Sequence, residues 1–330
     1  MTARPTVLAG VLLASAVALA GCAHGGGAAT PAQGAPAAGS GPAASAAAPA
    51  APAHDGPRTT LVLGSVSDDP AEEAAVFQPF ADHLAAALAP SGITAGRVEV
   101  AATTQEMAEL LRTGRVDLYV DSMHGVTTVV AEGAATPLLR RWKDGAPTYR
   151  SVVVARRDSG ITSPAQLAGR TVAFEEETST DGWLLPAAVL VQQGLPLAPA
   201  SEPGAVVPAG EVGYVYSGDD ENTVFLVLDG RVAAGALSEE DLAEDAGSRA
   251  DELVVVATTP DVPRHGVVAR TGLDPALAAA VRGVLTTLHE SEEGAEALAD
   301  FDGTARFDDL AAEDLAPVLE LRRVLADALG

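Results

Sequence analysis

Three consecutive polar residues, Ser179-Thr180-Asp181, separate a short apolar segment from an apolar helical stretch. The pattern predicts a strand over Thr171–Phe174 and a helix that includes residues 183–192. The serine and threonine hydroxyls are therefore placed at the start of a helix, where free backbone N–H groups and the helix dipole favour an anion. This arrangement suits the reversible binding of a phosphoryl-type oxyanion. The structural alternative is that Ser179 or Thr180 only caps the helix.

Two further candidates, Ser122 and His124, directly follow a strand predicted at Val116–Val120. Ligands of open α/β sheets bind at the carboxyl ends of strands, so we expect both side chains near a ligand. For His124, a structural role is the alternative.

The sequence contains no pattern typical of a catalytic or metal site. The H-E-x-x-H and G-x-S-x-G motifs are missing, and the six histidines lack ligand spacing. Cys22 is the single cysteine, which excludes an intramolecular disulfide and a cysteine-ligated metal cluster. We therefore expect no catalytic residue, no metal and no cofactor.

The N-terminus predicts export and lipidation. Arg4 precedes an apolar run over residues 7–20, which is short for a transmembrane helix and ends in Leu19-Ala20-Gly21-Cys22, a lipobox pattern. We expect residues 1–22 to be a lipoprotein signal peptide and Cys22 to carry the lipid, so that the protein is extracytoplasmic and anchored to a membrane. An ordinary secretory signal with a chance cysteine is the alternative.

Residues 23–57 consist almost entirely of Ala, Gly, Pro, Ser and Thr, which predicts a disordered tether with the folded part starting near Arg58. The formal net charge of −25 argues against nucleic acid as a partner, because phosphates would be repelled.

Beyond the tether, strand and helix patterns alternate, which predicts an α/β fold with parallel, doubly wound sheets. Leu111–Asp117 and Leu228–Ala233 resemble each other. In each, a predicted helix ends at a glycine and a predicted strand follows, and this internal similarity favours two similar lobes. The strands are expected at Thr60–Val66, Val98–Ala101, Val116–Val120, Ser151–Ala155 and Thr171–Phe174, and Thr103 with Glu106 predicts a capping box.

Several longer segments carry a family resemblance. They are Leu110–Leu118, similar to L-R-x-G-x-V-D-L, then Tyr149–Ile161 followed by Leu167–Phe174, and Ser179–Pro186, similar to S-T-S-G-Y-x-x-P. In order and spacing they resemble the PhnD-like phosphate/phosphite/phosphonate-binding proteins of ABC importers, over about Leu61 to Leu288. The resemblance implies a two-lobed type II periplasmic-binding-protein fold, each lobe a doubly wound, mostly parallel sheet flanked by helices. It further implies a small-molecule ligand, a permease and an ATPase as partners, a monomer, and no catalysis.

The expected organisation follows from the resemblance. Lobe closure would capture the solute, with hinges near Tyr149-Arg150 and Thr258–Pro263. The expected parts are the signal peptide (1–22), the tether (23–57), the first part of lobe 1 (58–149), lobe 2 (150–257), and the return to lobe 1 with the C-terminal helices (258–330).

The match also assigns site residues and shows departures. Tyr149 matches a family tyrosine beside the lobe crossover, but Asp181 replaces the third hydroxyl of the Ser-Thr-Ser motif. Asp220, next to Glu221, replaces the histidine of a family S-H-D motif. Asp121-Ser122-Met123-His124-Gly125 stands where the family usually has G-P-x-S-Y. A carboxylate about 4 Å from a phosphonate charge costs about 4 kcal/mol at an effective dielectric constant near 20.

Two ligand classes therefore remain open. In the first, the solute is an aminoalkylphosphonate-like zwitterion: Ser179-Thr180 hold its phosphoryl group, and Asp220 or Glu221 holds its ammonium. In the second, the pocket takes a cationic or neutral solute. The acidic residues are alternatively surface residues of an acidic protein, and a sensor lipoprotein is the alternative to transport.

Overall fold

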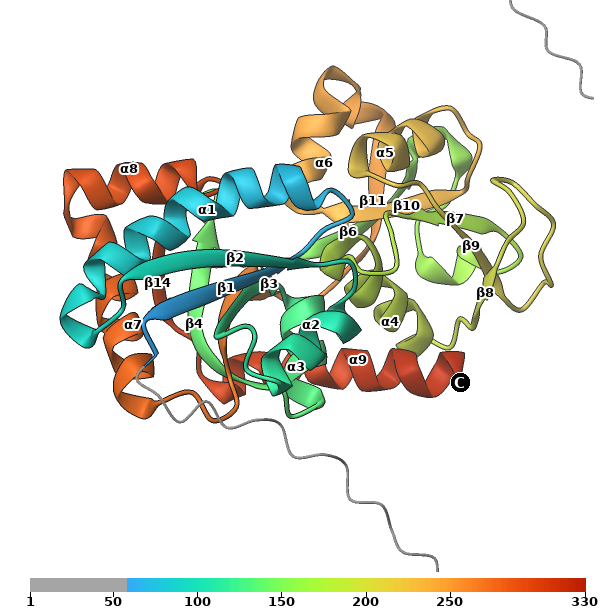
Figure 1. The fold of residues 1–330 in the computed structure, drawn as a ribbon. Helices are drawn as coiled ribbons and strands as arrows, with labels where there is room; N and C mark the ends of the chain where they lie inside the picture. The colour runs from blue at the N-terminus through green and yellow to red at the C-terminus, as the bar shows by residue number, and fades with distance from the viewer. Residues whose placement is uncertain (1–57) are drawn as a thin grey trace, which may run out of the picture. The chain divides into compact units, whose positions relative to one another are not determined.

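The structure is a computed structural model that describes residues 58–330 (Figure 1). The predicted signal peptide, Cys22 and the tether lie outside the described residues, so those expectations remain predictions. Residues 58–330 contain no helix long and apolar enough to span a bilayer.

The first six-stranded sheet and its helices form what we call lobe 1. Its strands β2, β1 and β3 are parallel, whereas β13, β4 and β14 continue the sheet in antiparallel pairs. The strand order is β14 (Thr304–Asp309), β4 (Ala135–Lys143), β13 (His265–Arg270), β3 (Leu118–Ser122), β1 (Thr60–Val66) and β2 (Ala95–Ala101). The helices of this lobe are α1 (Pro70–Ala87), α2 (Thr104–Arg112), α3 (Met123–Ala131), α7 (Pro275–Thr287) and α8 (Glu292–Asp300).

The second six-stranded sheet and its helices form lobe 2. Strands β8, β9, β7 and β10 are parallel, and β6 and β11 are antiparallel additions. The strand order is β11 (Leu253–Thr258), β6 (Ser151–Arg156), β10 (Ala234–Ser238), β7 (Thr171–Phe174), β9 (Val212–Tyr216) and β8 (Leu197–Pro199). The helices are α4 (Leu185–Gln192), preceded by a π-helical turn over Thr180–Leu184, α5 (Asp220–Leu228) and α6 (Glu239–Ala246).

The chain crosses between the sheets at a short antiparallel ladder of β5 (Thr148–Tyr149) and β12 (Val262–Pro263). Strands β6 and β13 start directly after these crossovers, so they run away from the junction, whereas β3, β7 and β10 run toward it. Both sheets are therefore mixed. The α/β two-lobed fold is confirmed, but in lobe 1 the antiparallel pairs outnumber the parallel pairs.

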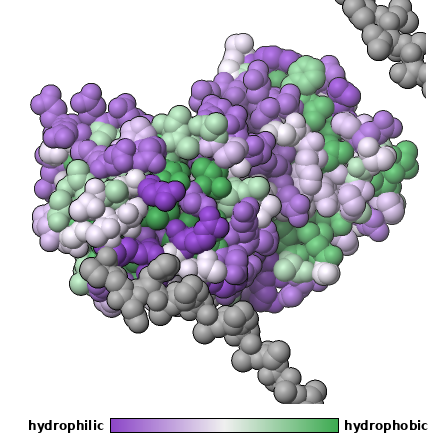
Figure 2. Space-filling view, in the orientation of Figure 1, coloured by the Kyte–Doolittle hydropathy of each residue, from purple (hydrophilic) through white to green (hydrophobic). Residues whose placement is uncertain are grey.

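Apolar side chains fill the interior of each lobe. In lobe 1, Phe80 stacks on Phe301 with ring centroids 4.0 Å apart. In lobe 2, every residue of β7 is buried, as expected for a central strand covered on both faces. The face in Figure 2 is largely hydrophilic, broken by smaller apolar patches.

One hydrophobic cluster continues from lobe 1 to lobe 2. It includes Met123 and Val126 of α3, Leu190 of α4, and Leu321 of the C-terminal helix α9 (Ala316–Leu329). Helix α9 packs against both α3 and α4, along the lower edge of the view in Figure 1. The C-terminal helix thus contacts both lobes.

Candidate ligand-binding site

A cavity of about 350 Å³ lies where strands of both lobes end. Lobe 1 contributes Val66 at the end of β1 and Ser122 at the end of β3, and lobe 2 contributes the loop after β7 and the first turns of α5 and α6. The lining includes six residues expected from the sequence: Ser122, Tyr149, Ser179, Thr180, Asp181 and Asp220. A second cavity, of about 400 Å³, shares Val66, Asp121, Lys143 and His265 with the first, so the two adjoin in lobe 1.

The hydroxyls at the start of the π-helical turn both have protein partners. Ser179 is the N-cap, and its Oγ accepts a hydrogen bond from the backbone N–H of Gly182 at 2.8 Å. The Thr180 hydroxyl contacts lobe 1, where it accepts from the backbone N–H of His124 at 2.7 Å and donates to Ser122 Oγ at 3.0 Å. Ser122 is the N-cap residue of α3, but its side chain makes no capping hydrogen bond. Thr180 therefore caps α3 from the opposite lobe.

Two buried donors in the lining lack an acceptor among residues 58–330. The Tyr149 hydroxyl, on a residue 5% exposed, and Nε of Arg264, on a residue 8% exposed, are both enclosed and make no hydrogen bond of ordinary geometry, although Thr180 and Asp181 lie near the hydroxyl. The Arg264 guanidinium carbon lies 5.4 Å from the centroid of the Tyr149 ring. Burial and the nearby Asp181 charge raise the pKa of Tyr149 well above its ordinary value, so the phenol keeps its proton.

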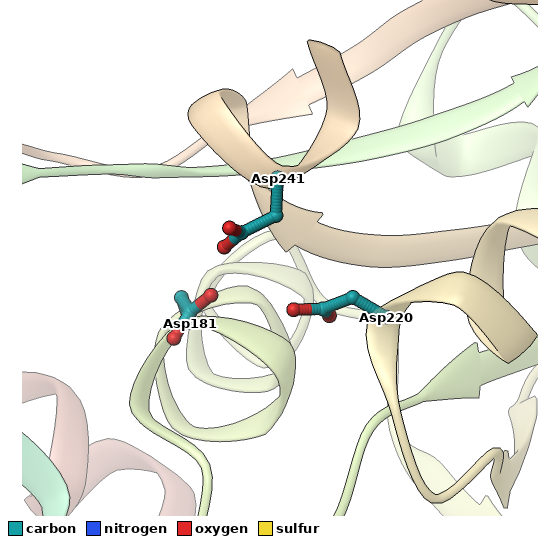
Figure 3. A group of neighbouring side chains, drawn as sticks. All are labelled: Asp181, Asp220 and Asp241. Atoms are coloured by element: carbon teal, nitrogen blue, oxygen red, sulfur yellow. The ribbon is translucent and has the colours of Figure 1, made fainter. Parts of the chain in front are cut away.

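On the lobe 2 side, three carboxylates converge (Figure 3). Oxygens of Asp181, Asp220 and Asp241 lie within 4.8 Å of one another. Burial raises the pKa of Asp181 to about 6. Burial and the charges of neighbouring carboxylates raise the pKa of Asp220 to about 8. Burial likewise raises the pKa of Glu175, at the start of the loop after β7, to about 7. Like charges this close cannot all ionise without a counter-charge.

Carboxylates therefore dominate the cavity. Its lining carries two cationic side chains, Lys143 and Arg264, against Asp121, Glu175, Glu176, Asp181, Asp220 and Asp241. Lys143 Nζ already lies 3.0 Å from Asp302. A ligand bearing only negative charge would meet repulsion on the lobe 2 side, whereas a ligand that also carries a cation would be favoured there.

Comparison with known proteins identifies the family. Residues 64–315 match the family model described as the periplasmic substrate-binding protein of a phosphonate ABC transporter. The chain belongs to this phosphonate-binding family. Its members bind solutes for transport and are not a class of enzymes, and their periplasmic role implies an extracytoplasmic location.

Solved structures agree with the family match. XAC2383 from Xanthomonas citri is 29% identical in its chloride-bound structure, with a TM-score of 0.76, and the match covers 82% of this chain and 99% of that chain. The same protein bound to ATP gives 27% identity and a TM-score of 0.74, covering 82% and 98%. PhnD1 from Prochlorococcus marinus, in complex with methylphosphonate, is 20% identical with a TM-score of 0.58, covering 81% and 98%, and supports the fold.

Two residues expected at the site from the sequence, Glu221 and His124, do not line the cavity. The Glu221 side chain is exposed, because it follows Asp220 on α5 and one helical residue rotates the side chain by about 100°. The His124 imidazole is largely buried, and burial lowers its pKa to about 4. It is therefore neutral near pH 7, and His124 contributes its backbone N–H to the Thr180 contact.

Sequence reasoning missed several residues that the fold brings to the cavity, chiefly Asp241, Arg264 and Lys143. Asp241 had a local signal, because Ser238-x-x-Asp241 is a capping pattern directly after a strand. Lys143 and Arg264 lie beside the two crossovers but are 121 positions apart in sequence. They reach the same cavity only because β5 pairs with β12.

Proposed function

We propose that this protein is the lipid-anchored solute receptor of an ABC importer, and that its interlobe cavity captures a small phosphonate-type oxyanion. Tyr149 and Arg264 donate hydrogen bonds to that oxyanion. The observation that carries the proposal is the pair of buried donors without acceptors in the lining. An unpaired buried polar group costs about 1–3 kcal/mol, so an acceptor that enters here gains that free energy.

The ligand classes of two relatives support the proposal. The P. marinus protein was captured with methylphosphonate and the X. citri protein with ATP, and both molecules carry oxyanionic phosphorus groups. Because the cavity has walls from both lobes, such a ligand stabilises the closed arrangement. The permease and ATPase of the importer then take the solute from the closed receptor.

Calorimetry with the Tyr149→Phe variant tests this function. Wild-type protein is expected to bind at least one compound among phosphate, phosphite, methylphosphonate and aminoethylphosphonate. Removing the phenol hydroxyl is expected to weaken that binding about tenfold, since one hydrogen bond to a charged group contributes about 1.5–3 kcal/mol. Tyr216→Phe is the matched control, because Tyr216 is 43% exposed and lies outside the lining. The proposal is wrong if no oxyanion binds, or if both variants bind like wild type.

A further inference from the structure

A third cavity, of about 490 Å³, lies in lobe 2 away from the interlobe cavity. It is lined where β7 and β10 begin and β6 ends, whereas the interlobe cavity is lined by the loop that follows β7. The two cavities are therefore at opposite ends of β7, which spans about 10 Å over its four residues. The charged residues of the third cavity are three arginines and one aspartate: Arg156, Arg170, Arg231 and Asp158. This excess of positive charge contrasts with the whole chain, which has 45 acidic residues and 20 lysines and arginines.

The two similar segments of the sequence explain this charge. In lobe 1, Gly114-Arg115-Val116-Asp117 leads from the end of α2 into β3, and in lobe 2, Gly230-Arg231-Val232-Ala233 leads from the end of α5 into β10. The two glycines have φ angles of 71° and 70°. The backbone N–H of Asp117 donates to the carbonyl of Val62 at 2.9 Å, and that of Ala233 donates to the carbonyl of Thr171 at 2.8 Å. Asp117 beside β1 therefore corresponds to Ala233 beside β7.

In lobe 1, Asp117 is fully buried and neutralises two arginines. It forms one ion pair with Arg58, which stands just before β1. It forms a second with Arg270, the last residue of β13, whose Nε is 3.1 Å from Oδ1. The other carboxylate oxygen accepts from the backbone N–H of Val62 at 3.0 Å. A buried carboxylate requires partners of this kind.

Lobe 2 has arginines at the corresponding positions. The ladder of β6 with β10, continued to the end of β6, puts Arg156 opposite Ala233. The ladder of β13 with β3 puts Arg270 opposite Asp117 in the same way. A further guanidinium comes from Arg170, which directly precedes β7. The arginine frame of lobe 1 is therefore repeated in lobe 2.

Lobe 2 lacks the carboxylate at the centre of this frame. Within residues 58–330, Arg170 and Arg231 form no ion pair, although both are exposed in an acidic protein. Arg156 pairs with the exposed Asp158. Because Ala233 ends at a methyl group, the space that corresponds to the Asp117 carboxylate is open to the cavity that Ala233 lines.

Thr171 adds two hydrogen-bond donors to the same wall. Its backbone N–H corresponds to that of Val62, which donates to Asp117 in lobe 1. Thr171 is 3% exposed, and its hydroxyl accepts from the backbone N–H of Gly204 at 3.0 Å. The hydroxyl proton has no acceptor of its own within residues 58–330, so it can be donated to a ligand.

We infer that this cavity of lobe 2 binds a phosphate dianion, either free or as the end group of a phosphomonoester, in the place that the Asp117 carboxylate takes in lobe 1. Three positive charges against one negative charge leave +2 in the lining, which a dianion neutralises. The planar fork of each guanidinium matches the spacing of phosphate oxygens and can donate two hydrogen bonds at once. The site lies outside the interlobe cavity, so it does not depend on the proposed function.

Equilibrium dialysis with inorganic phosphate tests the site. Ala233→Asp supplies in lobe 2 the carboxylate that lobe 1 has, and we expect this variant to bind one phosphate fewer per chain than wild type. Ala250→Asp is the matched control, because it adds the same charge to lobe 2 at an exposed position outside the lining, and it should keep the wild-type number. Melting temperatures establish that both variants fold.

A second variant keeps the test decisive if Ala233→Asp does not fold. Arg231 is exposed, so Arg231→Gln should fold, and we expect it to weaken the same phosphate at least tenfold. Any phosphate held in the interlobe cavity is counted equally in all these proteins, so the difference between them reports on the lobe 2 site alone. Equal phosphate binding by wild type and Ala233→Asp overturns the inference, and so does wild-type affinity in Arg231→Gln.

Glycerol phosphate distinguishes the two sources of the dianion. If wild type binds it with the same loss in Ala233→Asp, the cavity accepts the phosphate end of a larger molecule. If only inorganic phosphate shows that loss, the ligand is the free anion. If neither compound shows it, the inference is wrong.

Discussion

Asp220 combines burial with close negative neighbours, and this makes its protonation sensitive to pH and to ligand. The carboxylates that raise its pKa come from the loop after β7, the π-helical turn and α6, namely Glu175, Asp181, Asp241 and Asp245. Arg264, a cationic side chain of the lining, only partly offsets the raised pKa of Asp181. A ligand cation would favour the ionised form of the whole group.

A pH dependence follows at this residue. The pKa of Asp220 is about 8 in the folded protein and about 3.8 in its unperturbed state. Between these values the native state holds a proton that the unfolded state has lost, so the stability of the ligand-free protein falls as pH rises from about 4 to about 8. We expect the melting temperature to drop between pH 6 and pH 8.5 and to drop less in Asp220→Asn. A parallel drop in both proteins would contradict this assignment.

Binding of an amino-substituted solute, the zwitterionic class that the sequence leaves open, should show the opposite trend. Because the cation requires ionised carboxylates, affinity for an amine is expected to rise over the same interval, with release of protons. Calorimetry in two buffers of different ionisation enthalpy measures this release.

At the scale of elements, the contact between the π-helical turn of lobe 2 and the start of α3 joins the lobes. The Thr180 hydroxyl is 2.7 Å from the backbone nitrogen of His124 and 3.0 Å from Ser122 Oγ. Thr180 itself is only 1% exposed, so water does not readily replace these bonds. The contact therefore favours closed lobes before any solute is bound.

Thr180→Val should weaken this contact, because valine keeps the shape and loses both hydrogen bonds. We expect the closed form to lose about 1–3 kcal/mol, seen as a lower melting temperature and a larger radius of gyration of the ligand-free protein in X-ray scattering. Thr178→Val serves as the control, since its hydroxyl is exposed and bonds to Glu176 within the same loop. Unchanged scattering and melting in Thr180→Val would refute the role of this contact.

At the scale of the whole molecule, a lipid at Cys22, if attached as the sequence predicts, would tether a strongly acidic protein to a membrane. The described residues contain both sheets and the cavity, so the anchor and ligand capture are separable. Cys22→Ala is expected to abolish incorporation of a labelled fatty acid while leaving solute affinity unchanged. Labelling of Ser15→Ala, in the same apolar segment, is the control. Undiminished labelling of Cys22→Ala would contradict lipid anchoring at this residue.

The sequence alone determined the local features with strong periodicity. Strand β1 occupies the predicted Thr60–Val66, and Thr103 caps α2 by accepting from Glu106 N as its spacing predicts. Ser179 caps its helix start, which the sequence offered as the structural alternative to ligand binding. These features depend on hydrogen bonds and side-chain patterns within a few residues, which a sequence displays directly.

Tertiary structure alone decided the chemistry of the cavity. The sequence left open whether Asp220 or Glu221 faces a ligand, and the rotation of α5 brings Asp220 to the cavity and leaves Glu221 exposed. Asp241 and Arg264 reach the cavity through the pairing of β10 with β7 and of β12 with β5. The antiparallel pairs of β13 with β3 and β4 also depend on the tertiary structure, because β13 enters lobe 1 from the second crossover and runs opposite to both strands. Contacts between distant segments depend on how the whole chain packs, and local patterns do not encode that.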